Sequence, residues 1–245
     1  MRVLITRPEP DASELAAQLL AIGVDATPAP LLSIVPEPIE PMALAGASGL
    51  VATSRNGLQA LGQSEALASA LKLPVFTVGP ATTALAESLG FATVIPGPGT
   101  AGGLVATITA HRAQLGPGPL CHLAGDRLAF DLSAALARFG IVLKAVPAYR
   151  SYTATGLPPA VVEDLTAGRY DAVVLMSPRT AEVWQRLAGE AGIENCLGQL
   201  THVCLSAAVA DKLHSSKLKI AVAQGPNGQE IVSLVARLAA AHRRE

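Results

Sequence analysis

The chain has 245 residues, of which 50% are apolar, 15% charged and 3% aromatic. This length allows one large domain or two small ones, with enough apolar surface to fold without disulfide or metal support. Eighteen basic and nineteen acidic side chains leave a net charge of −1, which excludes a general attraction to nucleic acid. The three cysteines form no C-x-x-C pair, which argues against a disulfide framework or a zinc ribbon and favours a reducing compartment.

The sequence gives no sign of export or membrane insertion. The first apolar run, at residues 3–5, is too short for a signal peptide. The best apolar stretch, residues 15–24, ends at Asp25 and is well short of the ~20 residues that cross a bilayer. We therefore expect a cytoplasmic protein that does not enter a membrane.

Short aliphatic runs alternate with Ala- and Leu-rich segments of helical period. The predicted strands are residues 3–5, 25–28, 50–53, 75–78, 93–95, 120–123, 142–146, 172–176, 202–205 and 219–222. The predicted helices are residues 11–22, 56–61, 82–89, 104–111, 129–139, 180–188, 207–213 and 229–242. Apolar strands followed by helices are typical of parallel sheets covered on both faces. Ten strands favour an α/β protein with two five-stranded, doubly wound sheets.

The two halves of the chain resemble each other. A shift of 117 residues aligns Leu15, Leu19, Gly23 and Pro30 with identical residues, and a shift of 123 aligns the strand at 50–53 with that at 173–176. This predicts two copies of a flavodoxin-like unit, although chance similarity between Ala/Leu-rich helices is the alternative. A tandem arrangement would divide the chain into two domains near residues 116–119. If the chain instead passes between the domains at 35–41 and 151–155, each domain also has five strands.

Arginines follow four of the predicted strands, at Arg7, Arg55, Arg127 and Arg179. Ligands of open parallel sheets bind outside the carboxyl ends of the strands. Arginine outnumbers lysine 13 to 5, and its planar guanidinium suits carboxylate or phosphate. The sequence therefore predicts an anion-binding cleft. Hydroxyl and amide side chains in the same loops either cap helices or bind the ligand; they are Ser54, Asn56, Thr82, Thr83 and Ser177.

Signatures of other chemistries are absent or incomplete. The loop at residues 97–102 matches G-x-G-x-x-G, but it contains Pro98 and lacks an acidic residue about 20 positions on, so Thr100 as a helix cap is the favoured interpretation. The histidines have no metal-ligand spacing, and His122 and His202 fall inside apolar strands. No metal or organic cofactor is expected.

Tyr149 departs from the internal symmetry. The shift of 117 places it opposite Leu32, just beyond the aligned prolines and near a suspected domain crossing. It is either a packing residue or a proton donor beside the ligand.

These motifs, in this order and spacing, resemble the uroporphyrinogen-III synthase family along nearly the whole chain. The matching segments are Val3-Leu4-Ile5-Thr6-Arg7-Pro8, Thr53-Ser54-Arg55-Asn56, Val78-Gly79-Pro80-Ala81-Thr82-Thr83-Ala84, Ala101-Gly102-Gly103-Leu104, Val146-Pro147-Ala148-Tyr149-Arg150 and Val174-Leu175-Met176-Ser177-Pro178. The resemblance implies two related α/β domains joined by a two-stranded connector. Residues 1–35 and 154–245 would form one domain, and residues 38–150 would form the inserted second.

The resemblance also implies a reaction and a site. The enzyme would close hydroxymethylbilane, a linear tetrapyrrole with eight carboxylates, into uroporphyrinogen III, inverting ring D and releasing water without a cofactor. Tyr149 would assist departure of the hydroxyl group. The residues implied to bind substrate are Arg7, Ser54, Arg55, Gly79, Thr82, Arg127, Ser177, Arg179 and Ser206. The sequence departs from the family at Ser206-Ala207-Ala208-Val209, where Gly-x-Thr-Thr is common, which leaves Ser206 as the hydroxyl of that loop.

The family further implies a monomer that acts on a small molecule, with transient contact to hydroxymethylbilane synthase. Two other functions are compatible with the sequence. A two-lobed binding or sensor module for a polycarboxylate would need the same fold and arginines. A nucleotide-dependent transferase would instead use the loop at residues 97–102.

Overall fold

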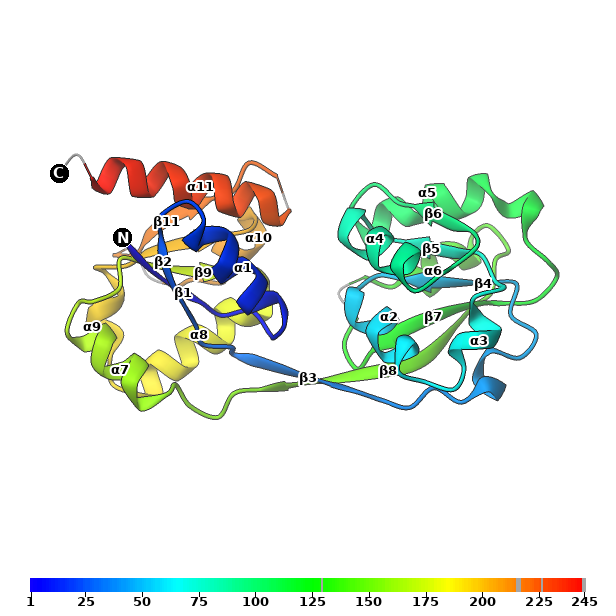
Figure 1. The fold of residues 1–245 in the computed structure, drawn as a ribbon, viewed down its shortest axis with the longest axis horizontal. Coiled ribbons are helices and arrows are strands. Elements are labelled where there is room, and N and C mark those ends of the chain that lie inside the picture. Colours follow the sequence, from blue (N-terminus) through cyan, green and yellow to red (C-terminus); the bar gives the residue numbers. More distant parts are fainter. Residues whose placement is uncertain (129, 215–216, 226, 244–245) are drawn as a thin grey trace. The chain divides into compact units, whose positions relative to one another are not determined.

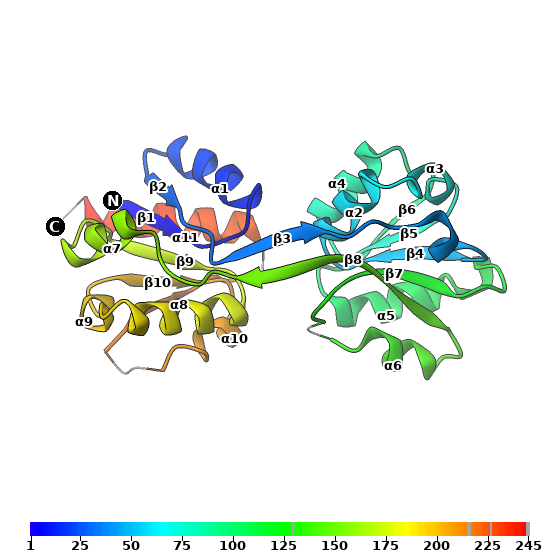
Figure 2. The same ribbon diagram turned by 90° about the horizontal axis from the view of Figure 1, so that it is seen from below.

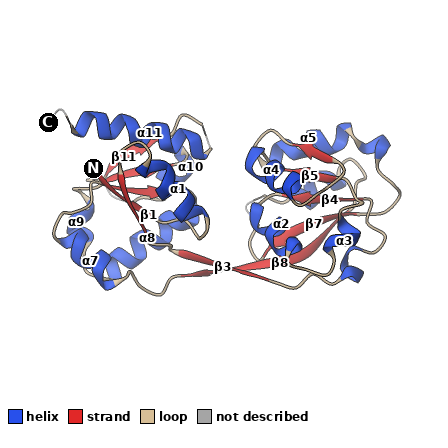
Figure 3. Ribbon diagram, viewed as in Figure 1, coloured by secondary structure: helices blue, strands red, loops and turns tan. Residues whose placement is uncertain are grey.

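The apolar runs of the sequence form parallel strands that alternate with helices (Figures 1 and 3). The computed structural model describes residues 1–128, 130–214, 217–225 and 227–243. Its contacts divide the chain into two units: unit 1 contains Met1–Ser33 and Tyr152–Glu245, and unit 2 contains Ile34–Ser151. In the part of the chain described, no helix combines the length and apolarity that a bilayer crossing requires.

Unit 1 holds a five-stranded sheet in the order β11-β10-β9-β1-β2. Its strands are β1 (Arg2–Ile5), β2 (Asp25–Pro28), β9 (Ala172–Leu175), β10 (Thr201–Cys204) and β11 (Lys219–Val222). Its helices are α1 (Asp11–Leu20), α7 (Pro159–Thr166), α8 (Pro178–Glu190), α9 (Glu194–Leu197), α10 (Ala207–Ala210) and α11 (Gly228–His242). Neighbouring strands pair in parallel throughout this sheet.

Successive side chains of a unit 1 strand enter two different cores, because the strand is covered on both faces. Leu4 and Val173 pack with Trp184 of α8 and with α7 and α9. Val3 and Val174 pack with α1 and α11 on the other face.

Unit 2 holds a sheet in the order β3-β8-β7-β4-β5-β6. Its strands are β3 (Leu32–Pro36), β4 (Gly49–Ala52), β5 (Val75–Thr77), β6 (Val94–Pro96), β7 (Leu120–Gly125) and β8 (Leu143–Thr153). Its α-helices are α2 (Arg55–Gly62), α3 (Leu67–Ala70), α4 (Pro80–Ser88), α5 (Ala101–Ala110) and α6 (Leu132–Ala137), and two 3-10 turns lie at Pro41–Leu44 and Arg112–Gln114. The sheet again separates two cores, one under α2 and α4 and one under α5 and α6.

The chain enters unit 2 along β3 and returns along β8, which lie beside each other with opposite directions (Figure 2). The prediction of two five-stranded sheets is therefore wrong for unit 2, whose sheet has six strands. β3 was not predicted because its side chains are partly or fully exposed and it ends in proline. β8 continues seven residues beyond the predicted end at 146, because its second half pairs with β3.

Some helix predictions also need correction. The predicted helix at 129–139 begins at a residue outside the described part of the chain, and α6 starts at Leu132, where Asp131 accepts a hydrogen bond from the backbone N–H of Ala134 at 2.9 Å. The predicted helix at 207–213 ends at Ala210. α7 was missed, although Pro159 occupies its first turn, where proline is favoured.

The strands that the two sequence shifts align occupy equivalent positions in their sheets. β1 and β2 of unit 1 correspond by the shift of 117 to β7 and β8, and β9 corresponds by the shift of 123 to β4. The orders β11-β10-β9-β1-β2 and β6-β5-β4-β7-β8 then match strand for strand. Duplication of one ancestral unit stays a prediction, with this shared topology in its favour.

Each unit buries one histidine in a central region of its sheet, as the apolar strands around them predict. His202 accepts a hydrogen bond from Trp184 Nε1 at 3.2 Å, and His122 Nε2 lies 2.8 Å from Thr53 Oγ1. Burial lowers the pKa of His202 and lowers the pKa of His122 to about 4. Both imidazoles are therefore neutral at pH 7, as groups that pack in a core should be.

The pKa of His122 predicts a specific loss of stability in acid. The unfolded chain takes up a proton near pH 6.5 and the folded chain only near 4, so the stabilisation is complete above 6.5 and disappears as the pH falls through this window. At about pH 4.5 the free energy of unfolding should have fallen by about 2–3 kcal/mol through this group alone. His122→Gln keeps a hydrogen-bonding partner for Thr53 but does not titrate. Urea unfolding should show a smaller fall in the free energy of unfolding in acid for this variant. An equal fall in variant and wild type would contradict the attribution of the loss to His122.

Candidate functional site

The predicted anion-binding residues lie at the carboxyl edge of each sheet, where two neighbouring central strands end. In unit 1, β1 and β9 pair in parallel, and Arg7 and Arg179 follow them. In unit 2, β4 and β7 pair in parallel, and Arg55 and Arg127 follow them. Parallel pairing brings the loops after both strands to one edge, so each unit presents two arginines at the same edge of its own sheet.

Ser54 and Ser177 occupy equivalent positions, as the shift of 123 predicts. Both have extended backbone at the N-cap of the helix that follows a central strand, with φ −151° in each. Ser54 Oγ accepts from the N–H of Asn56 at 3.2 Å, and Ser177 Oγ accepts from the N–H of Thr180 at 3.1 Å. The capping interpretation is therefore confirmed for these two hydroxyls.

Arg55 and Arg179 lie in the first turns of α2 and α8. A cation is disfavoured there because the helix dipole already makes this end positive, at a cost of about 0.3–1 kcal/mol per charge. Both side chains are half-buried. A positive side chain at a helix N-terminus, where it costs stability, is a suitable arrangement for an anionic ligand.

Arg7 and Arg127 differ in their surroundings. Arg7 is half-buried, forms an ion pair with Asp11 in the first turn of α1, and lies 3.4 Å from Met176 Sδ. A ligand carboxylate at Arg7 would share the guanidinium with Asp11. Arg127 is exposed in the loop after β7.

Tyr149 reaches the same edge of unit 2 from β8. The pairing of β7 with β8 shifts register between Ala124 and Gly125, so that Gly125 lies opposite Tyr149. The ring packs against the core under α2, and its hydroxyl shares a side-chain hydrogen bond with Ser54. The structure thus brings the predicted acid directly to a predicted binding residue.

Burial raises the pKa of the Tyr149 hydroxyl above its ordinary value. The hydrogen bond with Ser54 opposes this shift, and the negative charge of Asp126 adds to it. At neutral pH the group is therefore a protonated phenol, able to donate a hydrogen bond to a departing oxygen.

Three residues around Tyr149 were not predicted from the sequence: Gly125, Asp126 and Ser151. Gly125 lies against the phenol ring, and Asp126 joins the loop after β7 to β8 through Ser151, whose N–H and hydroxyl donate to Asp126 Oδ1 at 3.0 and 2.9 Å. The sequence contains one signal: a glycine ends a buried strand and an acid directly follows it. Their partners, Tyr149 and Ser151, lie 24 and 25 residues further along the chain, and the register shift that brings them together leaves no sequence pattern.

Gly79 and Thr82 belong to the entry of α4. Gly79 is the N-cap, and a Cβ there would lie 3.2 Å from the Cα of Gly99. The Thr82 side chain is 4% exposed, so its hydroxyl is shielded and a contact with substrate stays a prediction. Its half-buried neighbour Thr83 instead bonds to Thr77 Oγ1 at 2.7 Å and to the Gly79 carbonyl at 3.0 Å.

Ser206 and Thr100 lie at two further helix entries. Ser206 precedes α10 without a side-chain capping bond, and that helix has four residues. Thr100 caps α5 by accepting from the N–H of Gly103 at 3.1 Å, which confirms that the glycine-rich loop at 97–102 is a helix entry.

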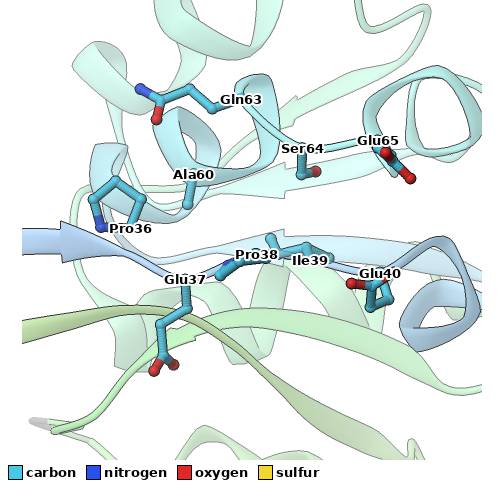
Figure 4. Close-up of a pocket in the computed structure, with 9 residues that line it drawn as sticks. All are labelled: Pro36, Glu37, Pro38, Ile39, Glu40, Ala60, Gln63, Ser64 and Glu65. Atoms are coloured by element: carbon cyan, nitrogen blue, oxygen red, sulfur yellow. The ribbon is translucent and has the colours of Figure 1, made fainter.

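One pocket of unit 2 does not suit an anionic ligand (Figure 4). It has a volume of about 350 Å³ and is lined by β3, the segment after it, and the C-terminal end of α2. Glu37, Glu40 and Glu65 line it, and its lining residues include no Lys or Arg. Glu37 is ion-paired with Arg150, so Glu40, Glu65 and the negative end of the α2 dipole are what disfavour a polycarboxylate there.

Comparison with known proteins agrees with this arrangement. A family model described as uroporphyrinogen-III synthase HemD matches residues 13–233. A crystal structure of uroporphyrinogen-III synthetase from Helicobacter pylori is 15% identical, with a TM-score of 0.65 over 97% of this chain and 100% of that one. A mutant uroporphyrinogen III synthase from Thermus thermophilus is 18% identical, with a TM-score of 0.59 over the whole of both chains. Curated protein sequences gave no significant match.

The structural likeness, at these identities, supports the fold: two α/β units with parallel sheets, as the sequence predicts. The family model covers most of the chain, including every predicted site residue except Arg7. The chain therefore belongs to the uroporphyrinogen-III synthase family.

Proposed function

We propose that this protein is a cofactor-independent lyase that cyclises hydroxymethylbilane to uroporphyrinogen III in tetrapyrrole biosynthesis. Family membership over residues 13–233 supports the activity. The observation that carries the chemistry is the Tyr149 hydroxyl, which is protonated, bonded to Ser54 and placed at an edge that also bears Arg55 and Arg127. A hydrogen-bond donor beside cationic groups suits a polyanion that must lose a hydroxyl group.

Tyr149 would assist the first step. Its hydroxyl donates a proton to the departing hydroxyl group of the substrate, and the C–O bond breaks. Water is released, and the substrate becomes an electrophilic azafulvene. Ring D attacks this carbon through its own substituted position, and the resulting spiro intermediate fragments and recloses with ring D inverted. The proton that the pyrrole loses on regaining aromaticity balances the proton given to water.

The arginines would hold the substrate through its eight carboxylates. Arg7 and Arg179 would act at the edge of unit 1, and Arg55 and Arg127 at the edge of unit 2. The hydrogen-bonding groups proposed beside them are Ser54, Gly79, Thr82, Ser177 and Ser206. Because free hydroxymethylbilane closes unaided to the uninverted isomer, holding the chain in a bent conformation would matter more than acid strength.

The remaining proposals concern the setting of the reaction. We place the enzyme in the cytoplasm as a monomer, in transient contact with hydroxymethylbilane synthase. The instability of the substrate favours such a contact, because less of it would be lost to spontaneous closure during diffusion.

The activity is tested by incubating the protein with hydroxymethylbilane and separating the oxidised uroporphyrin isomers. We expect type III to predominate. Type I at the uncatalysed ratio would reject the proposal. A binding module would give that rejecting result while still showing a raised melting temperature with uroporphyrinogen.

The role of Tyr149 is tested by Tyr149→Phe, which removes the donor and keeps the ring in the core. We expect turnover to fall by ~10²-fold with little change in KM, because the hydroxyl acts on the reacting bond. Tyr152→Phe, at an exposed tyrosine of the same chain, is the matched control. An unchanged rate for Tyr149→Phe would remove its catalytic role.

The arginines are tested by Arg179→Ala and Arg55→Ala. Each should raise KM several-fold. Added salt should reduce the difference in KM between variant and wild type, because salt screens the attraction that only the wild type has. Arg169→Ala is the control, since Arg169 precedes β9 at the opposite edge and pairs with Asp164. A KM that stays at the wild-type value would make Arg55 and Arg179 structural residues.

A further inference from the structure

The phenol end of Tyr149 occupies the space where a side chain at residue 125 would stand. A Cβ built on Gly125 would lie 2.5 Å from Tyr149 Cε2, 2.6 Å from Cζ and 2.9 Å from the hydroxyl oxygen. Distances under 3 Å are far inside ordinary carbon contact. Only glycine at this position allows the ring to lie where it does.

The conformation of Gly125 does not by itself require glycine. Its φ is not positive, so alanine is compatible with the backbone. The glycine is therefore explained by the close approach of the ring rather than by the turn.

Asp126 joins the turn after β7 to β8 by hydrogen bonds to the two residues that flank Arg150. Its N–H donates to the carbonyl of Tyr149 at 3.2 Å, and its carboxylate accepts from the N–H and the hydroxyl of Ser151. These bonds hold the backbone of Tyr149 against β7 at the register shift. The orientation of the phenol thus depends on two neighbouring residues: one leaves space for the ring, and the other fixes the strand that carries it.

We propose that Gly125 and Asp126 are positioning residues that hold the Tyr149 hydroxyl against Ser54 at the carboxyl edge of unit 2. The inference rests on the proposed role of Tyr149 in the reaction. The Asp126 charge has a second effect in the same direction, since it helps to keep the phenol protonated. The ring is the end of a side chain and the backbone is fixed on both sides, so a methyl group at residue 125 would displace the hydroxyl.

A double-mutant cycle tests the role of Gly125. Gly125→Ala should lower kcat by ~10-fold or more with KM nearly unchanged, because displacing a reacting group by about 1 Å has effects of this size. In the Tyr149→Phe background the same change should have no further effect on kcat, since no hydroxyl remains to be displaced. Equal losses in both backgrounds would show general distortion and overturn the proposal. Gly156→Ala, where a Cβ meets open space, is the matched control.

Asp126 gives a second test on an exposed side chain, where folding is less at risk. Asp126→Ala removes the acceptor for Ser151 and should lower kcat. Asp126→Asn keeps an acceptor oxygen and should restore most of it. Loss of activity in the asparagine variant equal to that in alanine would contradict a positioning role.

A titration of Tyr149 tests the positioning role independently of the proposed catalytic role. The ultraviolet difference between the wild type and Tyr149→Phe reports the ionisation of Tyr149 alone among the three tyrosines. Gly125→Ala should bring its pKa down toward that of a free tyrosine because the ring moves toward solvent. Asp126→Asn should lower it because the charge is gone. An unchanged titration in Gly125→Ala would overturn the positioning role even if Tyr149 proves catalytic, whereas full activity of Tyr149→Phe would reject only the reaction role of the tyrosine.

Discussion

The parallel pairing of central strands is the constraint on which the rest of the site depends. β4 pairs with β7 and β1 with β9, in each case in parallel and through mainly apolar, buried residues. Because both members of a pair end at the same edge, segments about 70 and 170 residues apart in sequence supply side chains to one surface. The cores on both faces fix that pairing, so the position of the arginines follows from packing.

Tyr149 is the exception, because it comes from within a strand rather than from a loop. β8 continues past the end of its neighbour β7, and the register shift at Ala124/Gly125 turns the tyrosine side chain to the edge. The same continuation pairs with β3 and carries the chain back to unit 1. One extended strand therefore both connects the two units and presents the phenol hydroxyl to Ser54.

The sequence predicts what local pattern determines. Aliphatic runs such as Val3–Ile5 and Ala172–Leu175 identify buried strands, and Ser54 and Ser177 are recognisable as caps because a serine precedes each helix. β3 is not predicted from the sequence, because its side chains are partly or fully exposed and it ends in proline. The Gly125–Tyr149 contact and the burial of Thr82 depend on tertiary packing, which no local pattern records. The ion pair of Arg7 with Asp11 also depends on tertiary structure, because Arg7 precedes α1 and helical spacing does not apply to it.

The central claim is that the ligand binds at the carboxyl edges of the sheets. Hydrogen–deuterium exchange with and without uroporphyrinogen III, kept reduced, tests it most directly. We expect slower exchange at residues 6–9, 53–57, 125–128 and 177–181. Exchange should not change at residues 116–119 and 168–171, which precede strands at the opposite edges. Protection confined to those opposite edges, or to the acidic pocket around Glu37 and Glu65, would contradict it.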